Sequence, residues 1–327
     1  MRYNASIVTA AVLAVCVAFG QSGGFAEEIV ERIAFGSCLH QDQPAPIWDA
    51  IVASDPDAWV WLGDNIYGDT DDGEVLAAAY AKVKAHPKYE KLRESASVYG
   101  TWDDHDFGKN NGGREWHGKA VAQKALLDFL DEPSESRRRK QEGVYASYDF
   151  GVGEKSVKLL LIDVRSHRDN PKQEDGDIFG AAQRSWIERE LSANEAALTI
   201  VTSGTQVIPE DHKYEKWAQF PSARTWFFER LVKYETGPVL FLSGDRHISE
   251  FSKLDLPGRE TPLYELTSSS LTHSWTSFSG EPNRHRVGEV FHQNSFGMLE
   301  IDWANRMAKV SIRDEVGEVQ QKLEIEL

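Results

Sequence analysis

Three short apolar segments of the chain each lead into at least one aspartate, and two of them also into a histidine. Residues 58–62 lead into Gly63-Asp64-Asn65-Ile66-Tyr67, residues 97–102 into Asp103-Asp104-His105-Asp106, and residues 239–243 into Gly244-Asp245-Arg246-His247. Runs of this length rich in aromatic and β-branched residues predict buried strands. Open α/β sheets carry their chemistry at the carboxyl ends of strands, so the three motifs predict one shared site for polyvalent cations.

These residue types indicate a hydrolytic site with two cations. One carboxylate must bridge the cations, and Asp64 fits because it lies in the tightest of the three motifs. Asp104, Asp245 and His247 would complete the ligand shells. Cations held in this way polarise phosphoryl oxygens and generate hydroxide from water near neutral pH. His105 fits a general acid, or a donor that stabilises the leaving group, with a structural histidine as the alternative.

Two further side chains restrict the choice of metal. Tyr67 follows Asp64 by three residues, and a phenolate ligand requires a strongly acidic cation such as Fe³⁺. Cys38 follows a predicted strand over residues 31–35, and a thiolate ligand disfavours a site built only for Ca²⁺ or Mg²⁺. The alternatives are a buried apolar thiol for Cys38 and simple packing for Tyr67. We reject a Ser-His-Asp enzyme because Ser37, Ser203 and Ser268 lack the Gly-x-Ser-x-Gly frame of a hydrolase nucleophile.

The motifs occur in an order that resembles the PhoD-like alkaline phosphatases, a branch of the calcineurin-like metallophosphoesterases related to purple acid phosphatases. The matching segments, which cover about residues 32–302, are 36–38, 63–67, 102–106 with Asn110-Asn111, 163–165, 244–247, 271–274 and 294–302. The resemblance implies an α/β fold, a four-layer α/β/β/α sandwich of two packed mixed sheets flanked by helices.

The resemblance also implies which metals are bound and by which residues. Fe³⁺ would be held by Cys38, Asp64, Tyr67 and His247. Ca²⁺ would be held by Asp64, Asp104 and Asp245, with Gln206 or Asn111 as further candidates. The sequence also allows divalent substitutes such as Zn²⁺, Mn²⁺ or Mg²⁺ at these positions.

Two residues are predicted to contact the substrate. By the resemblance, Arg165 would meet the phosphate and so join His105 and Asp104 as a catalytic residue; a simple pairing with Asp163 is the alternative. His273 is the second candidate for a substrate contact, with a surface position as its alternative.

The first 26 residues predict a Sec-type signal peptide. An apolar run over residues 6–20 follows Arg2 and is too short for a comfortable membrane span, and Gly24-Phe25-Ala26 offers a cleavage site. We therefore expect a periplasmic, secreted or cell-surface protein whose mature part, residues 27–327, is one catalytic domain without a stable membrane span. An uncleaved anchor is the alternative, and no twin-arginine pair is present.

The charge of the chain argues against some partners. The net charge is −16, and removal of residues 1–26 takes away one arginine and leaves −17. Such a protein does not hold nucleic acid or anionic membranes by bulk electrostatics. A small anionic substrate requires a local positive site.

The remaining segments predict alternating strands and helices, followed by strands alone. Helices are expected over residues 73–92, 119–130, 181–191 and 223–234, and further strands over 157–163 and 197–202. Segments at 263–267, 296–302, 308–313 and 322–327 predict a half-exposed antiparallel meander. Residues 69–72 predict a turn with a helix cap, and the basic run 137–140 a solvated surface.

The sequence thus predicts an exported metal-dependent phosphoester hydrolase of the alkaline phosphatase D type, acting on a small phosphate ester or phosphodiester. The alternative is a non-catalytic metal-binding or adhesion protein on the same scaffold. The choice among monoesters, diesters and phospholipids stays open, and so does the oligomeric state.

Overall fold

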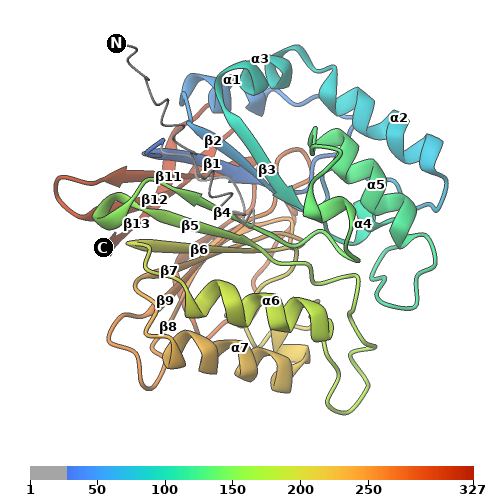
Figure 1. Cartoon of the computed structure of the whole chain (residues 1–327). Helices are drawn as coiled ribbons and strands as arrows, with labels where there is room; N and C mark the ends of the chain where they lie inside the picture. Colours follow the sequence, from blue (N-terminus) through green and yellow to red (C-terminus); the bar gives the residue numbers. More distant parts are fainter. Residues whose placement is uncertain (1–27) are drawn as a thin grey trace, which may run out of the picture.

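The computed structural model describes residues 28–327, and two β-sheets form its centre (Figure 1). The predicted signal peptide and its cleavage site lie outside the described residues. Within residues 28–327, every helix is too short or too polar to cross a membrane.

The first sheet has six strands in the order β13-β12-β11-β1-β2-β3. Its strands are β1 (Arg32–Gly36), β2 (Ala58–Leu62), β3 (Ser97–Thr101), β11 (Ser295–Asp302), β12 (Met307–Asp314) and β13 (Val319–Glu326). Strands β1, β2 and β3 run parallel, whereas β11, β12 and β13 form the antiparallel meander that the sequence predicts.

The second sheet has seven strands in the order β10-β8-β9-β7-β6-β5-β4. Its strands are β4 (Ala146–Phe150), β5 (Val157–Leu161), β6 (Leu198–Ser203), β7 (Val239–Ser243), β8 (Ser249–Leu254), β9 (Leu263–Ser268) and β10 (Arg286–Phe291). The prediction that residues 263–267 belong to the antiparallel meander is wrong. Strand β9 pairs in parallel with β7, because β8 carries the chain back along the far side of β9.

Helices cover the outer face of each sheet (Figure 1). They are α1 (Ile47–Ala53), α2 (Gly73–Lys84), α3 (Pro87–Ser95), α4 (Asp104–Phe107), α5 (Lys119–Phe129), α6 (Gly180–Ser192) and α7 (Pro221–Lys233), with 3₁₀ turns η1 (Arg137–Arg139), η2 (Gly153–Lys155) and η3 (Trp217–Gln219). The first five accompany the first sheet, and α6 and α7 accompany the second. The predicted four-layer α/β/β/α sandwich is confirmed.

Three hydrophobic cores fill the interfaces between the four layers. Strand β2 contributes to two of them, because Trp59 and Trp61 pack under the helices while Val60 and Leu62 pack between the sheets. A third core around Trp217 lies under α6 and α7. A parallel strand covered on both faces must be apolar throughout, which explains the uninterrupted sequence of β2.

The predicted helix over residues 73–92 is two helices. Helix α2 ends at Lys84 and α3 begins at Pro87, which occupies the first helical turn. Proline cannot continue a helix that precedes it, and it pushes the preceding residue out of the helical region; His86 has an extended ψ of 121°. The predicted cap is Asp72, whose side chain accepts hydrogen bonds from Glu74 and Val75.

The basic run over residues 137–140 is not a solvated surface throughout. Arg138 is 4% exposed, and its guanidinium donates to the carbonyls of Val144 and Gly100 and pairs with Glu132 at 3.1 Å. It therefore ties the loop after α5 to the end of β3. A charged group can be buried here because its donors contact backbone carbonyls, the Glu132 carboxylate and the Tyr148 hydroxyl.

We expect Arg138→Ala to lower the free energy of unfolding by about 3 kcal/mol, because two carbonyls and a carboxylate lose their buried partner. Urea denaturation of the purified protein measures this change. The matched control is Arg137→Ala, which removes an exposed arginine one residue away. Equal stability of the two variants would contradict the structural role of Arg138.

Candidate metal centre

The predicted ligands meet where parallel strands of both sheets end. Cys38 follows β1, Asp64 follows β2 and Asp104 follows β3 of the first sheet, while Asp245 and His247 follow β7 of the second. Helix α4, which begins at Asp104, marks this edge of the molecule in Figure 1. The structure thus brings together the three motifs that the sequence singled out.

The first group of candidate ligands is Cys38, Asp64 and His247. Their ligand atoms all lie within 4.8 Å of one another. The Cys38 Sγ is 3.4 Å from the Asp64 Oδ2, and the Tyr67 hydroxyl is 3.1 Å from the His247 Nε2. Sulfur, carboxylate, phenol and imidazole therefore converge on one point.

Two further groups share members with the first. Asp64, Asp104 and His105 offer ligand atoms within 4.8 Å of one another, and so do Asp103, Asp104 and Asp245. Asp64 belongs to the group with Cys38 and His247 and also to the group with Asp104 and His105. Asp104 likewise belongs to two groups, so the three groups adjoin one another. Asp103 was not among the predicted ligands; the adjacent pair Asp103-Asp104 after a strand is the signal that could have indicated it.

The backbone at these positions is unusual. Cys38, Asp64, Asp245 and His247 have φ values of 60°, 48°, 71° and 55°, a left-handed region that L-residues rarely adopt. Strained conformations of this kind persist where the surrounding fold enforces them and are concentrated at functional sites. Gly63 has a φ of 100°, and a side chain there would collide with Asp103. The glycine lets β2 and β3 approach closely enough for their carboxylates to meet.

The buried negative charge of the centre requires cations. Burial, together with the neighbouring carboxylates, raises the pKa values of Asp64 and Asp245 well above their usual range. Burial raises the pKa of Asp103 to about 6 even though Arg165 opposes the shift. Buried Asp103 Oδ2 and Asp104 Oδ1 have no hydrogen-bond partner among the described residues. Such oxygens are costly without a counterion, so these residues fit polyvalent cations.

Cys38 and Tyr67 fit the same requirement. Burial raises the pKa of the Cys38 thiol to about 11 and that of the Tyr67 phenol far above its usual value. Neither group would ionise at neutral pH without a strong Lewis acid beside it. Burial also lowers the pKa of His247 to about 4, so its imidazole is neutral and free to act as a ligand.

His105 lies beside the carboxylates and is held by Asp69. Its Nδ1 is 2.8 Å from the Asp69 Oδ2, and its ring packs on Tyr67 with centroids 4.3 Å apart. Burial alone would lower the pKa of His105, but the hydrogen bond to Asp69 and the charge of Asp104 raise it overall. The role of Asp69 was missed, because the sequence places it in a turn whose capping residue is Asp72.

Arg165 does not occupy the predicted position at the substrate. Its side chain is fully buried; Nε donates to Asp103 at 2.7 Å, and Nη2 lies 2.7 Å from Glu215. The alternative pairing with Asp163 is also wrong, since only the backbone N–H of Arg165 contacts that carboxylate. Both predictions fail because the acidic partners, Asp103 and Glu215, come from other segments of the fold.

Arg165 instead supports the ligands. Burial would raise the pKa of Asp104, but the charges of Arg165 and His105 outweigh burial and hold that pKa below its usual range. The guanidinium also fixes the orientation of Asp103. Arg165 thus acts on the site through the two carboxylates of the β3 motif.

The two further candidate ligands, Gln206 and Asn111, make hydrogen bonds to neighbouring residues. The Gln206 amide donates to Glu250 and Thr267 at 2.8 Å each, although its buried Oε1 has no partner among the described residues. Asn111 contributes its backbone N–H to Asp104 at 2.6 Å, while its side chain turns to Asn110. The position of Asn111 shortly after the Asp103–Asp106 motif could not show whether its backbone or its side chain faces the site.

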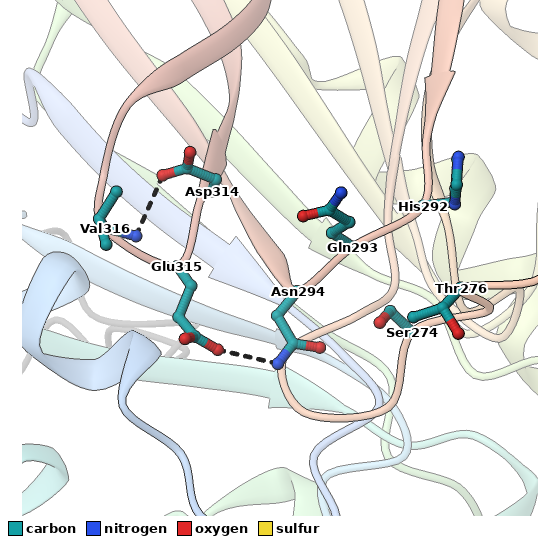
Figure 2. A pocket seen from close by; sticks show the side chains of 8 residues that line it. All are labelled: Ser274, Thr276, His292, Gln293, Asn294, Asp314, Glu315 and Val316. Atoms are coloured by element: carbon teal, nitrogen blue, oxygen red, sulfur yellow. Dashed lines mark hydrogen bonds between the residues drawn. The ribbon is translucent and has the colours of Figure 1, made fainter.

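His273 lies next to the candidate metal centre. The sequence left open whether this residue contacts the substrate or lies on the surface. Its ring is 4.4 Å from that of His247 and 5.3 Å from that of Tyr67, centroid to centroid. The residue that follows it, Ser274, lines a cavity of about 460 Å³ (Figure 2). In Figure 2, Asn294 and Glu315 are hydrogen-bonded across this cavity.

Comparison with known proteins identifies this arrangement. The family model described as PhoD-like phosphatase matches residues 77–320, which is more than half of the chain. The chain belongs to the PhoD-like phosphatase family. Its members are phosphatases, so the chain is a metal-dependent phosphoesterase, and the predicted resemblance is confirmed. No curated protein matches it in sequence.

Solved structures of low sequence identity share the fold. PhoD has a TM-score of 0.70 at 15% identity, covering 91% of this chain and 68% of PhoD. A dimetal phosphatase from Danio rerio has a TM-score of 0.56 at 12% identity, and the match covers 91% of this chain and 99% of the phosphatase. GAP50, described as the anchor in the inner membrane complex of Plasmodium, has a TM-score of 0.58 at 14% identity. The match covers 92% of this chain and 90% of GAP50.

Proposed function

We propose that the protein is an exported phosphoester hydrolase in which Asp64 bridges Fe³⁺ and a second cation, Ca²⁺ or a divalent substitute. The observation that carries this proposal is that Asp64 belongs both to the group with Cys38 and His247 and to the group with Asp104 and His105. Export rests on the apolar segment after Arg2. The retained ligand set is the argument against a non-catalytic role.

The ligands divide between the two positions by chemical type. Cys38, Tyr67, His247 and Asp64 would hold Fe³⁺, the cation acidic enough to ionise a phenol and a thiol with raised pKa values. Asp104 and Asp245, with Asp64, would hold the second cation, and Asp103 lies close enough to take part. When bound, the cations polarise the phosphoryl oxygens and lower the pKa of an attacking water.

His105 acts on the leaving group in this proposal. Its Nδ1 is engaged by Asp69, so Nε2 is left to donate a proton to the ester oxygen as the bond to phosphorus breaks. A pKa raised above the usual histidine value keeps this proton available near neutral pH. Asp69 holds the ring in orientation, and Arg165 holds Asp103 and Asp104.

Iron bound by Cys38 and Tyr67 has a spectroscopic consequence. We expect the purified protein to absorb visible light through charge transfer from thiolate and phenolate to the metal, with about one iron per chain. Tyr67→Phe should shift or remove the absorption. Visible spectroscopy and elemental analysis of both forms measure this. A colourless, fully active, iron-free protein would contradict the iron assignment, though not the bridging role of Asp64.

Turnover of chromogenic esters tests the proposed function. An aryl phosphate monoester and a diester with the same leaving group should both be assayed on the metal-loaded protein, together with a phospholipid. Hydrolysis that is lost on chelation and restored by metal supports the proposal. A protein that binds metal but hydrolyses none of these substrates would support the alternative, a non-catalytic scaffold.

A further inference from the structure

Besides the candidate ligand His247, three imidazole rings lie around Tyr67 at the candidate metal centre. His40 stacks on it nearly in parallel, with centroids 5.3 Å apart and planes 15° apart; His273 lies at 5.3 Å and His105 at 4.3 Å. His40 and His273 are themselves 6.5 Å apart. The proposed mechanism uses His105, but it gives no role to His40 and no specific one to His273.

Backbone contacts hold the two unused histidines side by side. The N–H groups of Leu271 and Thr272 donate to the carbonyls of Ser37 and Cys38, at 3.1 and 3.2 Å. The N–H of His40 donates to the Thr272 Oγ1 at 2.8 Å. The segment that carries the Cys38 ligand is thus fastened to the segment that carries His273, and both rings have a fixed place beside the ligands.

Both rings keep a nitrogen available for a ligand. The His40 Nδ1 accepts a hydrogen bond from the Asp42 N–H at 3.3 Å, so its proton lies on Nε2. The His273 Nδ1 is buried and has no partner among residues 28–327. A buried polar atom without a partner is costly, which points to a ligand that the protein itself does not supply.

The arginines around the centre are already paired with carboxylates. Arg165 is held by Asp103 and Glu215, and Arg246 by Glu281 at 2.6 Å. Arg168 is likewise paired with Glu215. The charges of these arginines are thus balanced by carboxylates, and the imidazoles of His40 and His273 lie beside the ligands as further donors for an anion that reaches the cations.

We propose that Nε2 of His40 and a ring nitrogen of His273 donate hydrogen bonds to one terminal oxygen of the substrate phosphoryl group, and that this pair selects phosphomonoesters over diesters. The inference rests on the proposed function. A monoester has three terminal oxygens: two face the cations, and the third, which carries charge, meets the pair. In a diester that third position holds an ester oxygen, a weaker acceptor whose substituent crowds the rings.

The test compares kcat/KM for an aryl monoester and a diester with the same leaving group in His40→Ala and His273→Ala. We expect each variant to lose about 10- to 100-fold on the monoester, the value of a hydrogen bond to a charged acceptor, and less than about threefold on the diester. His273→Asn, which keeps an N–H donor, should recover part of the loss. His117→Ala, an exposed histidine paired with Asp71, is the control.

Calorimetric titration with inorganic phosphate adds a readout independent of turnover. The two alanine variants should bind phosphate about ten times more weakly at unchanged metal content. Equal losses on both esters, or unchanged phosphate affinity, would overturn the inference. If the wild-type protein hydrolyses neither ester, the proposed function fails, and the phosphate titration still decides whether the histidine pair binds an anion.

Discussion

Replacing Asp64 with Asn is expected to lower kcat/KM by more than about 10³-fold, the largest effect of any single substitution considered. An amide cannot bridge two cations as a carboxylate does, and each cation contributes several kcal/mol to stabilising the transition state. Because Asp64 belongs to two groups of ligand atoms, metal content should fall at both positions. Elemental analysis and steady-state kinetics of the same preparation measure both effects.

The control for this substitution is Asp55→Asn. Asp55 has the same left-handed backbone conformation, with a φ of 48°, but it pairs with Arg32 on the surface. Asparagine tolerates this conformation, so neither variant should lose its fold. An Asp64→Asn protein that keeps two metals per chain and normal activity would refute the bridging role.

The second large effect is expected for His105→Ala. Loss of a general acid costs about 10² to 10⁴-fold in kcat, with metal content unchanged. The loss should be greatest for esters with poorly acidic leaving groups, which depend most on protonation. A smaller loss of the same kind is expected for Asp69→Asn, since the Asp69 carboxylate orients the ring at 2.8 Å. Kinetics over a series of aryl phosphates measures the trend.

His117→Ala serves as the matched control, because His117 also pairs with an aspartate, Asp71, at 2.6 Å but lies on the exposed surface. If His105→Ala cleaved esters of good and poor leaving groups with an equal loss, His105 would not be the acid. Its contact with Asp64 through the backbone N–H at 3.3 Å would then be its main contribution.

Much of the fold was predictable because its signals are local. The strands that end in ligands are continuous apolar runs, and β2 and β7 have the predicted bounds. Strand β9 was misplaced because its partner is chosen by tertiary pairing, which a sequence of alternating residues does not specify. Pro87 indicates a break between α2 and α3, but the helical periodicity of the residues on both sides led to the prediction of one helix.

The site was predictable for ligands that directly follow strands. It was less predictable for side chains whose contacts come from distant segments of the chain. Asp64, Asp104, Asp245 and His247 come together because parallel strands end at a common edge. The environment of Arg165 depends on Glu215, which lies 50 residues further along the chain in an irregular segment. The contact of Asp69 with His105 likewise depends on how the loop after β2 folds back over α4.

If two cations at Asp64 together make the protein a phosphoesterase, reconstitution of metal-free protein with metal should restore its activity. Hydrolysis of a chromogenic phosphate ester should be measured while Fe³⁺ and then Ca²⁺ are added to protein freed of metal. We expect no turnover without metal, little with iron alone, and full activity at two cations per chain. Full activity in the metal-free protein, or saturation at a single cation, would contradict it.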